Sequence, residues 1–296
     1  MNQKVSLVLS GGGARGLAHI GVIEELEKHD FQIVSISGAS MGAVVGGVYA
    51  LGKLDEFKKW MFSLDRLKVF NLVDFTFSSQ GLVKGDKVFK KMKEFIADEN
   101  IENLNIPFAA VAVDLINKKE VVFTKGSIYE ALRASVAIPT VLTPVKKAHE
   151  LLVDGGVLNN IPVAHIKRTA DDLLVVVNVN ADIPVPDSFA SKKEDDNNQS
   201  VYLKKLKAFY AHLQDNSPFE KEDNMGYFDL MNRVIDLMRD RLAKMTLEDH
   251  NPDLLVQISH ESCGTFDFYK AEEMVEMGRY TAKKCIGEYK KVSGTN

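Results

Sequence analysis

The chain has 296 residues, 45% of them hydrophobic and 26% charged, and its formal net charge at pH 7 is -4. This composition supplies enough apolar side chains for a sizeable core and excludes a disordered or fibrous protein. The acidic balance argues against a nucleic-acid partner, because phosphate binding requires a concentrated basic face. The two cysteines have no metal or redox spacing, and no apolar run is long enough for a signal peptide or a membrane span. We therefore expect a cytoplasmic protein without a metal site.

The first part of the chain has the pattern of a strand, a glycine loop and a helix. Residues 5–9 are rich in β-formers, and residues 17–29 are amphipathic. Between them, Gly11, Gly13 and Gly16 fit the G-x-G-x-x-G spacing of dinucleotide-binding sites. Those sites carry an acidic residue at the end of the second strand, where this chain has small residues instead. The sequence therefore argues against a nucleotide cofactor.

The same loop has a second chemical use. The consecutive glycines Gly11, Gly12 and Gly13 expose backbone N–H groups, and the helix that follows favours negative charge at its start. Such a loop can form an oxyanion hole, which stabilises the charge that develops during acyl transfer. Arg15 is expected either to brace the loop or to meet an anionic head group. The first two strands of a parallel sheet are commonly neighbours, so the loop should lie beside the end of the second strand.

That second strand ends in a serine between two glycines. The segment Gly38-Ala39-Ser40-Met41-Gly42 lies between an apolar strand and a helix of small residues. This arrangement is typical of a nucleophile elbow, in which a tight bend holds the serine hydroxyl out of the sheet. Gly42, Gly46 and Ala50 recur every four residues and predict a bare helix stripe against the strands. Ser40 is the candidate nucleophile.

The middle of the chain predicts alternating elements that lead to a candidate base. Helices are expected at 54–61, at 85–96 with Asp86 as N-cap, and at 128–135, and strands at 108–113, 120–123 and 151–153. The last strand runs into Asp154-Gly155-Gly156, which places a carboxylate at a sheet edge with open space beside it. Asp154 is therefore the candidate base.

The C-terminal third has a different character. The expected elements are a strand at 173–179, a mobile loop at 184–200, helices at 201–213 and 227–246, a strand at 254–258 and a helix at 271–289. In the helix at 227–246, Leu230, Val234, Leu237 and Met238 share one face. That face could close over an acyl site, contact a membrane or mediate self-association, and packing on the main sheet is the favoured interpretation.

Three linked motifs give the chain a family resemblance. The G-G-G-x-R-G loop, the G-x-S-x-G elbow and the D-G-G turn each follow a predicted strand in this order, and together they resemble the patatin-like phospholipase family, especially its bacterial cytoplasmic members. The resemblance implies a three-layer α/β/α fold with a mostly parallel central sheet. The matching motifs give a catalytic core at 5–168. Residues 169–296 are expected to complete the sheet and to include the mobile loop at 184–200, and a helical lid at 201–248 is one of the roles left open for the helices there.

The resemblance also implies a site. Ser40 matches the family nucleophile, Asp154 matches the aspartate of its Ser-Asp dyad, and the amides of Gly11, Gly12 and Gly13 match its oxyanion hole. Arg15 matches the loop arginine. The motif glycines are Gly16, Gly38, Gly42, Gly155 and Gly156.

The implied reaction is hydrolysis of a lipid or other acyl ester through an acyl-serine, without metal or cofactor. A thioesterase acting on acyl-CoA and a catalytically weak lipid-binding regulator stay open, as does self-association. A Ser-Asp-His triad with His250 or His260 as base is the competing catalytic scheme, and its chain order also fits. Against it, Ser40 follows only the second strand, whereas the fold that uses such triads builds several strands before its elbow.

Overall fold

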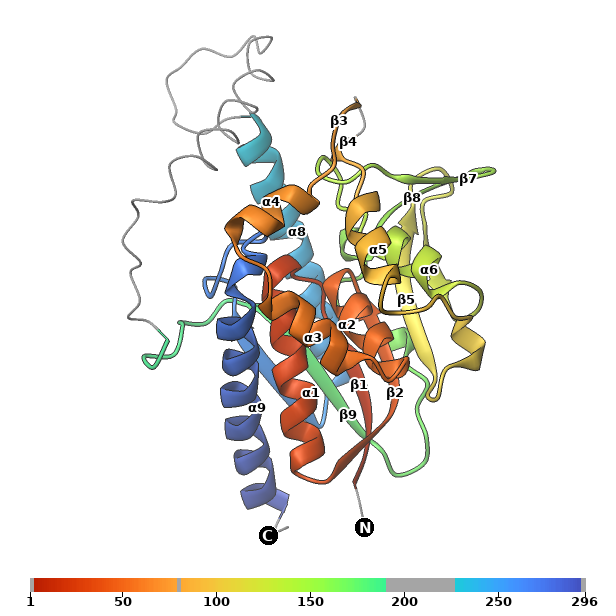
Figure 1. The fold of residues 1–296 in the computed structure, drawn as a ribbon. Coiled ribbons are helices and arrows are strands. Elements are labelled where there is room, and N and C mark those ends of the chain that lie inside the picture. Colours follow the sequence, from red (N-terminus) through yellow and green to blue (C-terminus); the bar gives the residue numbers. More distant parts are fainter. Residues whose placement is uncertain (1–2, 79–80, 190–226, 294–296) are drawn as a thin grey trace. The chain divides into compact units, whose positions relative to one another are not determined.

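The structure is a computed structural model that describes residues 3–78, 81–189 and 227–293 (Figure 1). The chain divides into two compact units, residues 1–185 with 238–296, and residues 186–237. The expected helix at 201–213 and most of the expected loop at 184–200 lie outside the described residues.

The first unit is built on one mixed sheet. Its strand order is β10-β9-β1-β2-β5-β8-β7, and β6 pairs with β5 beside this path. The five strands from β10 to β5 are parallel, while β6, β8 and β7 join antiparallel. The bounds are β1 Gln3–Leu9, β2 Phe31–Ala39, β5 Phe108–Asp114, β6 Lys119–Phe123, β7 Val145–Lys147, β8 Glu150–Asp154, β9 Leu173–Ala181 and β10 Leu254–Ser259. A separate hairpin joins β3 Phe75–Ser78 and β4 Gly81–Val83.

Helices cover both faces of this sheet. Their bounds are α1 Ala18–Lys28, α2 Met41–Ala50, α3 Leu54–Phe62, α4 Arg66–Leu72, α5 Asp86–Lys93, α6 Ile128–Ser135, α8 Tyr227–His250 and α9 Ala271–Ser293. Successive residues of β1 show the two layers, because side chains alternate across a strand. Leu9 faces Gly46 of α2, whereas Val8 joins a core cluster with Ala243 of α8. The sheet is therefore buried on both sides, as the fully buried stretch from Val5 to Leu9 requires.

Small residues set the spacing between α2 and the strands, as the sequence predicted. A Cβ on Gly42 would overlap the carbonyl oxygen of Leu9, and one on Gly46 would lie 2.6 Å from Cγ2 of Ile36. Both contacts are closer than real Cβ atoms tolerate, so this helix can approach the sheet only through glycines.

One predicted detail is wrong. Asp86 is not the N-cap of α5, because the cap is Gly85 in the left-handed region with φ 78°, and Asp86 is the first helical residue. The predicted apolar face of α8 belongs mostly to the second unit, and the side chains of Leu230, Val234, Leu237 and Met238 are exposed among the described residues. Helix α8 packs instead through Ala243 and Leu247, which contact the cluster formed by β1, β9 and residues 161–163.

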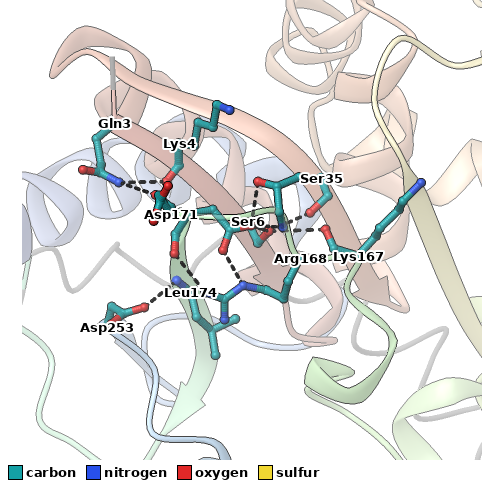
Figure 2. Close-up of polar contacts among 11 residues, drawn as sticks. Gln3, Lys4, Ser6, Ser35, Lys167, Arg168, Asp171, Leu174 and Asp253 are labelled. Carbon is teal, nitrogen blue, oxygen red and sulfur yellow. Dashed lines mark hydrogen bonds and ion pairs between the residues drawn. The ribbon is translucent and has the colours of Figure 1, made fainter. Parts of the chain in front are cut away.

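A polar network connects β1 and β2 with the segment that precedes β9, at the opposite end of the strands from Ser40 (Figure 2). The Ser6 hydroxyl hydrogen-bonds to that of Ser35 at 2.9 Å and donates to the buried carboxylate of Asp172 at 2.6 Å. Arg168 and Thr169 also donate to Asp172. Burial alone raises the pKa of this carboxyl, but these hydrogen bonds outweigh it and lower the pKa. The network fixes the segment that leads into β9.

Within the described ranges, no helix combines the length and the apolar character needed to cross a membrane.

Candidate active site

Ser40 stands on a strained turn between β2 and α2. Its backbone has φ 52° and ψ -126°, a conformation that non-glycine residues rarely adopt. The turn is tight, since a Cβ on Gly38 would lie 2.6 Å from the amide nitrogen of Ala43. This is the local geometry of a nucleophile elbow, and it lifts the serine side chain out of the strand.

Ser135 of α6 stabilises this turn. The Ser40 amide donates to the Ser135 hydroxyl at 2.9 Å, and that hydroxyl donates to the carbonyl oxygen of Val111 in β5 at 2.7 Å. Ser135 is fully buried. No role for Ser135 could be assigned from the sequence, because its partners Ser40 and Val111 lie 95 and 24 positions away.

The sheet register brings Asp154 to the same place. Ala39 pairs with Val111, and Asp154 pairs with the next residue of β5, Ala112. Ser40 and Asp154 therefore lie on the two sides of β5, next to Val111 and Ala112, although they are far apart in the sequence. The carboxylate is held by an Asx turn, in which the Gly156 amide donates to Oδ1 at 2.7 Å.

Burial makes the Asp154 carboxyl a weaker acid. Desolvation raises its pKa from 3.8 to about 6, and the nearby Ser40 hydroxyl, the hydrogen bond from the Gly156 amide and the positive charge of Arg239 oppose the increase. Its Oδ2 atom is buried and accepts no hydrogen bond from the described residues. The Ser40 hydroxyl thus lies near enough to influence the pKa of Asp154 but outside hydrogen-bond geometry, which is common before substrate binds.

The glycine loop lies against the elbow, with a Cβ on Gly11 reaching within 3.0 Å of Ser40 Cβ. The Gly11 amide donates to the carbonyl oxygen of Asn160 at 3.2 Å, so it is already engaged. The Ala14 amide is likewise engaged, by the carbonyl oxygen of Thr265. Among the described residues, the amides of Gly12 and Gly13 donate to no acceptor. Of the three amides predicted as oxyanion donors, that of Gly11 is therefore engaged within the described residues, whereas those of Gly12 and Gly13 are not.

Arg15 is turned into the protein. The residue is 7% exposed, and its guanidinium donates to the carbonyl oxygens of Val179 and Cys263 and to Oδ1 of Asn180, at 3.2, 3.0 and 2.8 Å. Of the two predicted roles, these contacts favour bracing of the loop over recognition of a head group.

His19 holds the start of the glycine loop through a hydrogen bond to Ser10. Its ring lies fully buried in α1, and Nε2 hydrogen-bonds to the carbonyl oxygen of Ser10 at 2.8 Å. Burial lowers the pKa of His19 to about 4, so the imidazole is neutral at physiological pH and Nε2 is the donor.

The two histidines of the competing triad lie elsewhere. Three strand spacings separate β2 from β10, about 14 Å, so His260 at the end of β10 is remote from Ser40. His250 is the last residue of α8 and precedes the start of β10, whereas Ser40 follows the end of β2. Because β10 and β2 run in the same direction, His250 and Ser40 lie at opposite ends of the strands. The described residues also contain no group of three or more His, Cys, Asp or Glu side chains that could hold a metal ion.

Three comparisons place the chain among known proteins. The model of the patatin-like phospholipase family matches residues 7–166. An uncharacterized NTE family protein of Mycobacterium bovis is 32% identical, and the alignment covers 96% of this chain and 92% of that protein. The lysophospholipase NTE1 of Scheffersomyces stipitis is 26% identical over 98% of this chain, which spans 18% of that protein. Among solved structures, VipD from Legionella pneumophila has a TM-score of 0.49 and 14% identity, over 97% of this chain and 67% of that one.

The family match extends from β1 through the glycine loop, the elbow and the Asp154 turn, and the mycobacterial relative matches nearly end to end. The chain therefore belongs to the patatin-like phospholipase family.

Proposed function

We propose that this protein is a serine acyl hydrolase that cleaves carboxylic esters of lipids through an acyl-Ser40 intermediate. One observation carries the proposal: Ser40, on a strained turn, lies beside a buried carboxylate and a loop in which two amides donate to no acceptor of the described chain. Membership of the phospholipase family supports the same reaction class.

Asp154 is the proposed general base. Serine is a poor nucleophile at neutral pH and requires a proton acceptor within hydrogen-bond reach. The raised pKa, about 6, makes the Asp154 carboxylate a stronger base than an exposed aspartate while leaving it ionised at pH 7. As the Ser40 oxygen attacks the ester carbonyl, its proton passes to Asp154, which then delivers it to the leaving alcohol.

The amides of Gly12 and Gly13 are the proposed donors to the tetrahedral oxyanion. Water next attacks the acyl-serine, gives its proton to Asp154 and releases the fatty acid, and the proton returns to Ser40. Donors of this kind typically contribute a factor of about 10² to 10³ each to kcat.

Lysophospholipids are the substrate class that we propose first, because a relative matched over almost the whole chain is named a lysophospholipase. A thioester of CoA would meet the same nucleophile and oxyanion donors, so acyl-CoA is the second candidate. The third is a lipid-binding regulator with little turnover.

Hydrolysis of a short p-nitrophenyl ester by matched variants tests the proposal. Ser40→Ala and Asp154→Asn should each lower kcat by about 10³ or more, while His250→Gln and His260→Gln should change it less than about threefold. Activity that survives Asp154→Asn but is lost with either histidine variant would establish the triad instead. Absence of turnover by the unmodified protein on this ester, lysophosphatidylcholine and acyl-CoA would favour the regulator.

A further inference from the structure

The carbonyl oxygen of Gly11 is held by two amide side chains. Nδ2 of Asn180, in β9, donates to it at 2.6 Å, and Nδ2 of Asn160 donates to it at 3.4 Å. Both residues are buried, at 7% and 5% exposure. Buried side-chain amides that meet on one carbonyl oxygen fix the direction of that carbonyl group.

The orientation of the Asn180 amide is itself determined. Arg15 has only donors, and its guanidinium donates to Asn180 Oδ1 at 2.8 Å. The opposite end of the side chain, Nδ2, must then face Gly11. The Asn180 backbone is held as well, because its N–H donates to Oδ1 of Asn178 at 3.0 Å.

A fixed Gly11 carbonyl also fixes the amide of Gly12. The two groups belong to one planar trans peptide unit, in which C=O and N–H point in opposite directions. When Asn180 holds the oxygen on one side, the Gly12 N–H must point to the other. Gly12 has no Cβ, and a Cβ there would overlap Cγ2 of Val179, so the loop has little room to turn.

We propose that Asn180, braced by Arg15, is a positioning residue that aims the Gly12 amide at the oxyanion of the reacting ester. This inference rests on the proposed function and adds a residue outside the segment 7–166 that matches the family model. It also explains the role of Arg15, which orients the Asn180 side chain and so acts indirectly on the Gly12 amide.

The kinetic arm of the test replaces the donor by an acceptor of the same shape. Asn180→Asp keeps the oxygen that accepts from Arg15 and turns the other end into a group that repels the Gly11 carbonyl. We expect kcat on a short p-nitrophenyl ester to fall about 100-fold with KM changed less than about threefold. Asn180→Ala removes the donor without adding charge and leaves Asn160 in place, so its kcat should fall about tenfold.

Asn178→Asp is the matched control, because Asn178 is equally buried on the same strand and, among the described residues, makes its side-chain hydrogen bond through Oδ1, which the aspartate retains. We expect its kcat within about threefold of the unmodified protein. Equal losses in the two aspartate variants, or a loss carried by KM, would overturn the proposal. Thermal unfolding of each variant establishes that the folded fraction is unchanged under the assay conditions.

A second arm is independent of activity. The chain has four Gly-Gly peptide bonds, so glycine labelled with both carbonyl ¹³C and ¹⁵N gives HNCO signals only for Gly12, Gly13, Gly47 and Gly156. Asn180→Asp should move the Gly12 signal most and leave that of Gly47, in α2, in place. An unmoved Gly12 signal refutes the positioning role, whatever the enzyme hydrolyses. If the Gly12 signal moves but the unmodified protein hydrolyses no ester, the result supports the positioning of the Gly12 amide by Asn180 and refutes the proposed function.

Discussion

At the scale of single residues, the site holds two groups in states that they would avoid elsewhere. Ser40 has a left-handed φ, which typically costs about 1 to 3 kcal/mol for a non-glycine residue. Asp154 is buried with one carboxylate oxygen that accepts no hydrogen bond from the described chain. Both states suit the proposed reaction, because the turn lifts the Ser40 side chain out of the strand and the unpartnered oxygen of Asp154 is available to the Ser40 proton. The surrounding fold must offset their cost.

Replacement of Asp154 by Asn should therefore abolish hydrolysis and yet raise the free energy of unfolding at pH 8. The pKa of Asp154, about 6, lies above its ordinary 3.8. The folded protein then binds this proton more tightly than the unfolded chain, so stability falls as pH rises from about 4 to about 6. A neutral amide avoids this loss and should gain up to about 3 kcal/mol. Urea unfolding of both proteins at pH 4 and pH 8 measures the difference.

His19 contributes with the opposite sign. Its pKa, lowered to about 4, means that the unfolded chain binds the proton first, so stability falls as the pH drops from about 6.5 to about 4. This contribution is common to both proteins, and the difference between them isolates Asp154. A stability difference that is absent at pH 8, or that does not shrink toward pH 4, would contradict the charged, desolvated carboxylate.

Ser40 and Asp154 could be proposed from the sequence because each ends a β-rich run and lies next to or near glycines. Asn180, Asn160 and Ser135 could not be given a role in the same way, because each acts through a contact with a segment at least 95 positions away. Nor could the sequence tell that the Gly11 amide is engaged, because its acceptor is a backbone carbonyl.

At the scale of elements, two helices touch through glycines on one face of the sheet. A Cβ on Gly21 of α1 would overlap the carbonyl oxygen of Val275 in α9, and one on Gly278 of α9 would overlap that of Ala18 in α1. Figure 1 shows these two helices side by side. The backbones approach so closely that neither position can accept a methyl group without separating the helices.

Gly278→Ala should thus destabilise the protein although alanine is the better helix former. We expect a loss of about 2 kcal/mol or more, because the added methyl group meets backbone that cannot move aside. Gly287→Ala is the control in the same helix, since nothing lies within 4 Å of its Cβ position, and it should gain about 0.5 to 1 kcal/mol. Chemical denaturation of the two variants compares them, and the account fails if both shift the midpoint in the same direction.

Most elements could be predicted because hydrophobic periodicity and turn residues coincide with them. The predicted strands at 108–113 and 120–123 form an antiparallel pair, and the helix at 128–135 has the predicted bounds. Helix α4 and strand β7 went unpredicted because each is short, at seven and three residues, and shows little periodicity. The cap of α5 was misassigned because the left-handed Gly85, rather than the carboxylate beside it, begins the helix.

At the scale of the whole molecule, the segments beyond the family match contribute directly to the site. β9 carries Asn180, and the lower part of α8 packs through Ala243 against Ile161 and Val163, just after the Asp154 turn. Arg239 lies one turn before Ala243 on the same face of α8, and its charge lowers the pKa of Asp154. The C-terminal third of the chain thus influences the pKa of the proposed base, Asp154.

Arg239→Gln should move the acid limb of the kcat/KM profile to higher pH. Loss of a nearby positive charge disfavours the carboxylate, so the apparent pKa should rise by about 0.5 to 1 unit. Arg239→Lys keeps the charge and should restore most of the profile. If Arg239→Gln leaves the pH profile of kcat/KM unchanged, or if Arg239→Lys shifts it equally, the charge of Arg239 does not influence the proposed base.

If Ser40 and Asp154 react as one unit, a fluorophosphonate probe should label Ser40 at a rate that depends on Asp154. We predict that mass spectrometry finds the label on the peptide that contains Ser40 and that the labelling rate falls below a pH of about 6 as Asp154 takes up its proton. Asp154→Asn should lower this rate by about 10² or more. Label on another residue, or a rate at Ser40 unaffected by Asp154→Asn, would refute the proposed Ser-Asp dyad.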